Sequence, residues 1–554
     1  MYAPMEYDCL KPAQLPHTTR LYSDYLAWRG RPPKSNRVAE FYEHAPTLAG
    51  VRAAAGELKH GMAKYPASMR AEVGDILRTQ NMALYGGALP AAVERNLAAL
   101  ASGAAAIVTG QQVGLFGGPA YALYKALSAL RIASELSKRG VRAVPIFWMA
   151  SEDHDLAEVN HVEWLADKGR ERLDWKGTAQ NEGGSVGRIT FGAEITQILE
   201  RADDSLGGAA SGEIAEILRN AYLPERTFSS AFANLMSALL GERGLLIFDP
   251  IDARVSRLAA PLYRRAIEQQ QEITKSLLEQ NKRIEKAGYH AQVKVTERSS
   301  LLFRNIGGKR VAIARKNSGF VAGGVEICGP DLAEAISQHP EEFSANALLR
   351  PVLQDTLLPT VAYIGGPAEI AYFAQNRVVY EKLLGRTPAF LPRASFTLIE
   401  SGVERLLKKY QLSVDDVFRG RQHLRLKMET QNLPRGLAAR FTTERKNLEK
   451  MLAGMKKPIG KVDATLAGAL ETASKKMLFQ FDKLRAKTGR AEAFRAGVLD
   501  RHELALRDAL YPENALQERS LSLLPFLARD GMDLLADLEE KAGIDAAPHC
   551  LIRL

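Results

Sequence analysis

Residues 104–125 read AAAIVTGQQVGLFGGPAYALYK, and this stretch decides the fold. A short apolar run leads through a glycine-rich turn to Pro119, a residue type favoured in the first turn of a helix. A helix-periodic segment, 120–139, follows, and residues 143–150 (AVPIFWMA) form a second apolar run. Neither run alternates with polar residues, as expected of parallel strands that are buried on both faces. The stretch therefore predicts a strand–helix–strand unit.

Three further apolar runs extend this pattern toward the C-terminus. They are residues 244–248 (GLLIF), 360–364 (TVAYI) and 389–391, and a predicted helix at about 368–384 separates the last two. Buried strands that alternate with helices indicate the α/β class. We therefore expect an open parallel sheet with helices on both of its faces.

The intervals between these strands are too long for simple crossovers. Residues 166–243 and 252–357 are therefore expected to hold inserted helical and small antiparallel pieces. Within the second interval, residues 254–286 predict a long helical stretch, and apolar runs on either side of Gly307-Gly308 predict a hairpin.

From residue 397 the pattern becomes helical for about a hundred positions. Its clearest apolar stripe comprises Ile459, Val462, Leu466, Leu470, Ala473, Met477, Phe481 and Leu484. Pro458 suits the first turn of that helix, so we expect two long helices, joined near 454–458, to form an antiparallel coiled-coil arm. The stripe is narrow and leaves apolar residues for a second chain, which predicts a homodimer with Leu466, Leu470 and Met477 in or beside the seam.

The expected organisation follows from these patterns. The core, with a helical lead-in, is expected at residues 1–395, the arm at 396–495, and a C-terminal segment that returns to the core at 496–554. The composition, 46% hydrophobic and 25% charged, is ordinary for a globular chain with a large core.

Composition also limits the location and the partners of the protein. No apolar run reaches the roughly 18 residues of a membrane span, and the first residues do not resemble a signal peptide. The three cysteines are far apart in the sequence, which favours a reducing compartment over a disulfide framework or a structural zinc site. We therefore predict a cytoplasmic protein that does not bind a membrane.

Positive charge is concentrated in the predicted arm. Residues 400–490 contain 21 lysines and arginines against 10 aspartates and glutamates, which accounts for the whole net charge of +10. A solvated basic surface is the favoured interpretation, without nucleic acid as a partner. The alternative is a binding or scaffold protein that presents a basic arm to nucleic acid.

Ionisable residues follow the second predicted strand as Ser151-Glu-Asp-His-Asp155. Strand ends of this kind form the ligand-binding edge of a parallel sheet. We predict His154 as acid or base, Asp153 or Asp155 as its orienting partner, and Glu152 as a fourth catalytic candidate that contacts a substrate amine or hydroxyl group. A metal site and a purely structural polar network are the other interpretations, and we rank metal below acid–base chemistry because a third well-spaced ligand is missing.

Two glycine loops complete the predicted site. Each follows a buried strand and precedes a helix that begins near a proline, a design suited to binding an anion. Neither loop is a GxGxxG or GxxxxGK[ST] motif. We predict that the two loops face one another and form a single pocket for an anionic ligand. The substrate-binding candidates are Thr109, Gly110, Gln111, Gln112, Gly114, Asn160, His161, Gln354, Gly366, Glu369 and Tyr372.

Several blocks together carry a family resemblance. They are TGQQVGLFGGPAYALYK, PIFWMASEDHDLAEVNH, LRPVLQDTLLPT and YIGGPAEIAYF, with LYSDYL and FYEH before them and LQER at 516–519 after them. In this order they resemble the bacillithiol biosynthesis cysteine-adding enzyme family over nearly the whole chain.

The resemblance implies a Rossmann-like core with inserted connecting elements and a coiled-coil arm through which family members dimerise. It implies the last step of bacillithiol synthesis, in which the carboxyl group of cysteine joins the amine of glucosaminyl malate. Activation of a free carboxylate implies ATP. The residues implied for an adenine nucleotide, in a second pocket, are Arg393, Ser395, Gln517 and Arg519. A ligase that acts on another amine is the remaining alternative.

Overall fold

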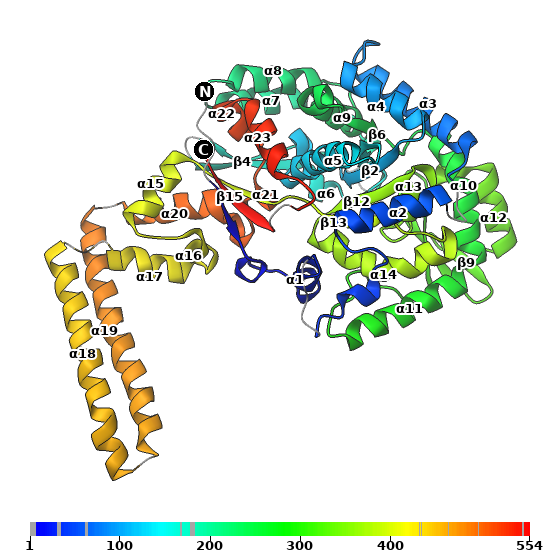
Figure 1. Cartoon of the computed structure of the whole chain (residues 1–554). Coiled ribbons are helices and arrows are strands. Elements are labelled where there is room, and N and C mark those ends of the chain that lie inside the picture. The colour runs from blue at the N-terminus through cyan, green and yellow to red at the C-terminus, as the bar shows by residue number, and fades with distance from the viewer. Residues whose placement is uncertain are drawn as a thin grey trace. The chain divides into compact units, whose positions relative to one another are not determined.

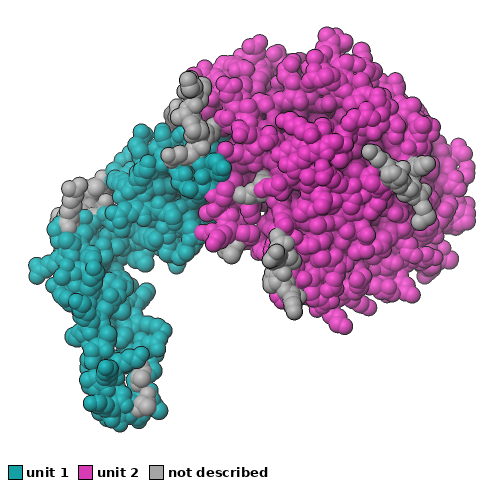
Figure 2. Space-filling model, viewed as in Figure 1, with its two compact units in different colours: residues 1–8, 397–517, 551–554 teal, residues 9–396, 518–550 magenta. Residues whose placement is uncertain are grey.

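The computed structural model describes residues 7–29, 35–60, 65–166, 169–177, 183–431, 433, 435–463, 465–496, 498–545 and 548–554. Figure 2 shows two compact units. Unit 1 comprises residues 1–8, 397–517 and 551–554, and unit 2 comprises residues 9–396 and 518–550. No helix in the described ranges is both long and apolar enough to cross a membrane.

The centre of unit 2 is a five-stranded parallel sheet. Its spatial order is β13 (Ala389–Pro392), β12 (Thr360–Gly365), β2 (Ala105–Gln111), β3 (Ala143–Met149) and β6 (Leu246–Phe248). All five strands predicted from the sequence are therefore confirmed. The chain proceeds from β2 to β3 and β6 on one side and later adds β12 and β13 on the other. The direction in which successive strands are added to the sheet therefore reverses between β2 and β12, although all five strands are parallel. A sheet of this type binds ligands at such a point.

Helices cover both faces of this sheet, as predicted (Figure 1). Ile107 of β2 shares a hydrophobic cluster with Ile132 of α5 (Tyr121–Lys138) on one face. The next residue, Val108, shares a different cluster with Leu77 of α3 (Ala67–Leu84) on the other face. The remaining helices of these two layers are α2 (Leu48–His60), α4 (Ala91–Ala101) and α14 (Pro367–Leu383).

The first inserted interval contains a hairpin and three helices. They are β4 (His161–Ala166), β5 (Gly169–Asp174), α7 (Glu194–Ser205), α8 (Ser211–Ala221) and α9 (Phe228–Leu240). The aromatic rings of Trp175, Phe191 and Phe228 pack against one another. This interval therefore has its own small core, as expected for an insertion of helical and antiparallel pieces.

The second interval contains a five-stranded antiparallel sheet in the order β10-β9-β8-β7-β11. Its strands are β7 (Ser299–Ile306), β8 (Lys309–Lys316), β9 (Gly319–Ala322), β10 (Val325–Ile327) and β11 (Phe343–Ala345). The predicted hairpin around Gly307-Gly308 is confirmed as β7–β8. The predicted long helical stretch is confirmed as two consecutive helices, α10 (Ala253–Glu268) and α11 (Gln270–Lys286). The side chains of Gln270 and Thr274 donate to the carbonyl oxygen of Ser299, which fixes the start of α11 on β7.

Unit 1 is mainly helical and contains the arm. Its helices are α15 (Ser401–Lys409), α16 (Val414–Phe418), α17 (Arg421–Gln431), α18 (Arg435–Val462), α19 (Leu466–Ala496) and α20 (Leu499–Leu510). The helices α18 and α19 lie side by side (Figure 1), with Phe441 and Phe481 in ring contact and Arg445 Nε 2.9 Å from Asp482 Oδ1. The predicted antiparallel arm is confirmed.

The predicted joint of the arm is wrong. Helix α18 continues through Gly454 and Pro458, and the turn follows Val462, where Asp463 Oδ1 accepts from the amide of Thr465 at 2.7 Å. Pro458 is exposed, so water can satisfy the carbonyl group that loses its helical partner. The predicted stripe therefore spans two helices, since Ile459 and Val462 belong to α18.

A three-stranded sheet near the chain ends was not predicted. Its order is β1 (Tyr7–Leu10), β15 (His549–Arg553) and β14 (Phe396–Ile399). The expectation of a helical pattern from residue 397 is therefore wrong at its start. There FTLI forms a strand because the C-terminal segment, 155 positions later, supplies the hydrogen bonds. The C-terminal helices α22 (Leu524–Asp530) and α23 (Asp533–Lys541) belong to unit 2.

Candidate active site

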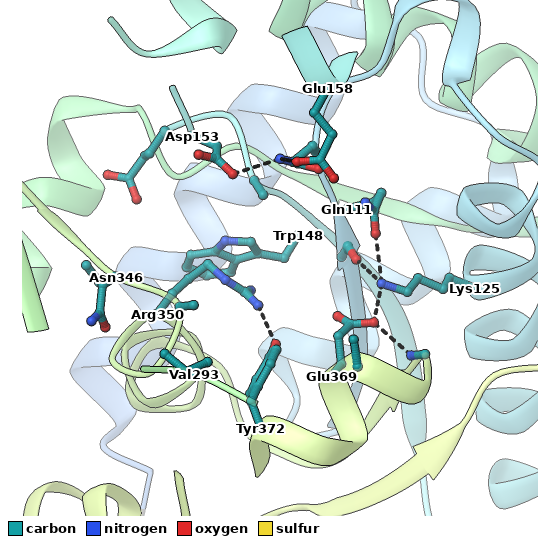
Figure 3. Close-up of a pocket in the computed structure, with 18 of the residues that line it drawn as sticks. Gln111, Lys125, Trp148, Asp153, Glu158, Val293, Asn346, Arg350, Glu369 and Tyr372 are labelled. Carbon is teal, nitrogen blue, oxygen red and sulfur yellow. Dashed lines mark hydrogen bonds and ion pairs between the residues drawn. The ribbon is translucent and has the colours of Figure 1, made fainter. Parts of the chain in front are cut away.

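A cavity of about 670 Å³ lies at the carboxyl ends of β2, β3 and β12, within unit 2 (Figure 3). Its volume is in the range of roughly 300–1,000 Å³ that is usual for small-molecule sites. The wall includes residues 110–112 after β2 and residues 366–369 after β12. The two glycine loops therefore meet at one pocket through these residues, while residues 113–118 of the first loop do not line it, and an anionic ligand stays a prediction. The pocket lies at the point where the strand order reverses.

The loop after β2 is anchored by a buried lysine, Lys125, from the first turns of α5. Its ammonium group donates to the carbonyl oxygen of Gly110 at 2.8 Å and to Gln111 Oε1 at 2.9 Å, and it forms an ion pair with Glu369 (Figure 3). Burial lowers the pKa of Lys125, and the Glu369 carboxylate opposes that effect. A side chain at Gly110 would overlap the carbonyl oxygen of Trp148, so packing of β2 against β3 requires glycine there.

Glu369 joins the two loops from the start of α14. Its carboxylate accepts from the amide of Gly366 at 2.8 Å and from the Tyr363 hydroxyl at 2.6 Å. Burial alone would raise the pKa of Glu369, but the charge of Lys125 and these donors outweigh it and hold the pKa below its usual value. Glu369 therefore remains ionised, and the Lys125–Glu369 pair fixes the distance between the loops.

Arg350 projects into the cavity from the start of α13 (Arg350–Leu357). Its guanidinium group donates to the hydroxyl of Tyr372 at 3.1 Å (Figure 3). Among the described residues, no carboxylate lies within ion-pair distance of this half-buried cation, although Glu369 is nearby. A cation of this kind is suited to binding an anionic group of a ligand.

The turn after β3 presents Glu152 to the cavity. Ser151 fixes this turn because its hydroxyl donates to Asp249 Oδ1, after β6, at 2.5 Å. Burial raises the pKa of Glu152 to about 7, although the charge of Arg310 opposes the shift. A carboxyl group with this pKa can accept and release a proton near neutral pH.

Asp153 and His154 lie beside Glu152 on the cavity wall. Asp153 Oδ2 accepts from Gln112 Nε2 at 2.8 Å, while Asp153 Oδ1 lies 3.3 Å from His154 Nδ1. The same ring nitrogen lies 3.4 Å from an amino group of Arg310, whose guanidinium group stacks 4.0 Å from the centre of the Phe303 ring. Asp153 is thus in the position of the orienting partner of His154. Asp155 instead caps the short helix α6 (Leu156–Val159).

Several predicted substrate-binding residues lie outside the cavity wall. Thr109 donates to the carbonyl oxygen of Ile364 at 2.9 Å and so joins β2 to β12. The carbonyl group of Gly114 accepts from the Tyr222 hydroxyl at 3.3 Å. The remaining three residues contact neighbours in the protein: Asn160 donates to Trp175, His161 contacts Asn160, and Gln354 donates to Asp355.

The four residues implied for a nucleotide are divided between the cavity and the interior. Arg393 and Arg519 line the cavity described above, not a second pocket. Arg393 is buried and donates to both carboxylate oxygens of Glu518, at 2.9 and 2.6 Å. The hydroxyl of Ser395 also donates to Glu518, and the buried side chain of Gln517 pairs with the backbone of Leu398.

Several residues of the cavity wall were not predicted from the sequence. They include three cations, Lys125, Arg310 and Arg350, as well as Asn346 and Tyr121. Lys125 and Arg350 stand inside the quoted motifs, each in the opening turns of a helix that follows a motif loop, and a cation at such a place is a usable signal. Arg310 comes from the inserted antiparallel sheet, and nothing in its local sequence indicates a site. No group of three or more histidine, cysteine, aspartate and glutamate side chains in the described ranges is placed to hold a metal ion.

Comparison with known proteins divides the chain into two domains near residue 395, and it assigns residues 518–550, which belong to unit 2, to the C-terminal domain. Residues 5–394 match the domain described as "Bacillithiol biosynthesis BshC, N-terminal Rossmann-like domain", and residues 396–554 match the corresponding C-terminal coiled-coil domain. A protein of Koribacter versatilis named "Putative cysteine ligase BshC" is 42% identical over 99% of both chains. Proteins of the same name from Solibacter usitatus and Salinibacter ruber are 36% identical over 98% of this chain and 99% of theirs, and 32% identical over 81% and 82%. The chain therefore belongs, over both of its domains, to the bacillithiol biosynthesis BshC family.

Proposed function

We propose that this protein is a ligase that joins cysteine to glucosaminyl malate in the last step of bacillithiol synthesis. The bond formed is an amide between the carboxyl carbon of cysteine and the amine nitrogen of the sugar. ATP activates the carboxyl group. The names of the relatives support the cysteine ligase assignment, and the geometry of the cavity supports this pair of substrates.

The observation that carries the proposal is the position of Arg350. It is a half-buried cation in the cavity without a carboxylate partner in the described residues, and Arg519 is an exposed cation on the same wall. Both proposed substrates carry carboxylates, and ATP carries phosphates. Because guanidinium groups bind carboxylates and phosphates with paired hydrogen bonds, these two arginines suit either kind of anion.

Glu152 is proposed as the general base. The sugar amine must lose a proton before its lone pair can attack the activated carboxyl carbon, and an amine is mostly protonated at neutral pH. A carboxylate with a pKa of about 7 at the cavity wall can take that proton. Asp153 and His154 then orient the polar groups of the substrate, because the side chain of His154 is exposed whereas that of Glu152, the proposed base, is half-buried.

Nucleotide contacts are proposed for Arg393 and Arg519 alone. Ser395 and Gln517 use their polar atoms inside the protein, so they are poor candidates for a ligand contact. The arm is proposed as the site of homodimer formation, because Met477, Phe479 and Leu484 of α19 are about half exposed or more.

Reconstitution tests the proposal directly. The purified chain is incubated with cysteine, glucosaminyl malate and ATP, and the thiol product is labelled and identified by mass. Formation of bacillithiol with release of AMP indicates an acyl adenylate, whereas release of ADP indicates an acyl phosphate. A strain without this protein should accumulate glucosaminyl malate. A strain with an unchanged thiol profile, together with an inactive purified protein, would overturn the assignment.

A further inference from the structure

The structure brings two cysteines together from opposite ends of the chain. Cys9 on β1 and Cys550 on β15 are 541 positions apart in sequence, and their sulfur atoms are 3.3 Å apart. The strands β1 and β15 are neighbours in one sheet. All three cysteines are free in the structure, and the third, Cys328, is exposed on the start of α12 (Gly329–Gln338).

The two sulfur atoms have different surroundings. Cys9 is exposed, whereas Cys550 is only 4% exposed. Burial, together with the adjacent Cys9 thiol, raises the pKa of Cys550 to about 12. Attack on a sulfur atom requires a thiolate, so the solvent-facing Cys9 is the group that reacts first.

We propose that Cys9 and Cys550 are a modification site at which a low-molecular-weight disulfide forms a reversible bond between the two ends of the chain. The sulfur atoms must approach by about 1.2 Å to reach the usual bond length of about 2.05 Å. Rotation of the two side chains is sufficient for a movement of this size, because the strands are already paired. The proposal is independent of the ligase reaction.

The exchange proceeds in two steps. The Cys9 thiolate attacks one sulfur of the small disulfide, its S–S bond breaks, and one small thiolate leaves. The Cys550 sulfur then attacks Cys9 Sγ, gives up its proton to the departing thiolate, and releases the second small thiol. Overall, two protein thiols and one disulfide give one protein disulfide and two small thiols, so the protein is oxidised and the small disulfide is reduced.

The bond would act on the wall of the cavity through β15. The amide of Cys550 donates to the carbonyl oxygen of Ser395 at 2.9 Å, and His549 contacts the Ser395 hydroxyl at 2.6 Å. The same hydroxyl donates to Glu518, which holds Arg393 at the cavity. Fixing Cys550 to β1 therefore restrains the strand that supports Arg393.

Thiol counting on the full-length protein tests the proposal. The reduced chain is treated with cystine at about pH 8, excess reagent is removed, and free thiols are titrated after denaturation under conditions that block further exchange. Non-reducing peptide mapping then identifies the linked peptides. We expect one crosslink that contains Cys9 and Cys550, with both of these thiols lost from the titration.

Two substitutions provide the controls. In Cys550→Ser the reaction should stop at a mixed disulfide on Cys9, whereas in Cys328→Ser the crosslink should form as in the unaltered chain. A persistent mixed disulfide at Cys9 in the unaltered protein, without the crosslink, would overturn the proposal. Recovery of both thiols under conditions in which Cys328 reacts would also overturn it. Neither result depends on folding of a variant, because both are read from the unaltered chain.

Discussion

Replacement of Glu152 by glutamine should make the protein more stable and less active. The pKa of Glu152 is about 7 in the fold against an ordinary 4.5, which corresponds to about 3 kcal/mol. Between these two pH values the folded chain holds a proton that the unfolded chain has released, so the free energy of unfolding falls as the pH rises. Above pH 7 the Glu152 carboxyl group is ionised in the folded chain, so the full cost of burying its charge lowers the free energy of unfolding. Glutamine carries no charge to bury, so Glu152→Gln should be more stable than the unaltered protein by about 3 kcal/mol at pH 8 and by almost nothing at pH 4.

Denaturant unfolding at several pH values measures this difference, and the ligase assay measures its functional counterpart. If Glu152 is the base, the rate of the unaltered enzyme should rise as the pH increases through about 7, and Glu152→Gln should lower kcat by about 100-fold or more. Glu158→Gln is the matched control, since Glu158 lines the same cavity but is exposed. Its stability should change little with pH relative to the unaltered protein. Equal stability of Glu152→Gln and the unaltered chain at pH 8 would refute the assignment of a buried, proton-holding carboxyl group.

Three further predictions concern the cavity and the arm. Arg350→Gln should raise KM for an anionic substrate by about 10- to 100-fold with a smaller change in kcat, because a charge-assisted hydrogen bond is lost, and steady-state kinetics would show an unchanged KM if Arg350 does not bind the anion. Lys125→Met should destabilise the fold by about 3–5 kcal/mol because it leaves Glu369 buried without its partner, and the double variant with Glu369→Gln should recover most of the loss in denaturant unfolding. Paired replacement of Met477 and Leu484 by aspartate should shift a homodimer to monomer in sedimentation without loss of helix, since both side chains are about half exposed; a monomeric unaltered protein would contradict this.

The parallel sheet could be predicted because each of its strands carries a local signal. Buried strands on both faces of a sheet are continuous apolar runs, and glycines and prolines mark the ends of the helices. The pairing of the glycine loops also follows from this pattern, since both come directly after strands of one sheet. Pro458 was misleading because proline is common at the start of a helix but tolerated in an exposed helix interior.

The electrostatics of the site could not be predicted, because they depend on burial and on distant segments. Glu152 and His154 are separated by one residue, yet the fold half-buries the first and exposes the second. Arg310, which influences both, comes from a strand 156 positions after His154. The family resemblance implies a nucleotide contact for Ser395 and Gln517, but their hydrogen bonds show roles inside the protein.

Unit 2 consists of two segments of chain that are synthesised at different times. Residues 9–396 emerge from the ribosome first, but residues 518–550 of the same unit emerge only after the whole arm. Domains tend to fold as they are completed during synthesis. A nascent chain that has already formed the parallel sheet still lacks Glu518 and Arg519, so its cavity has an open wall and Arg393 has no counter-ion. The cavity wall is therefore completed only after residues 518 and 519 are translated, and a chain that stops before them has no complete site.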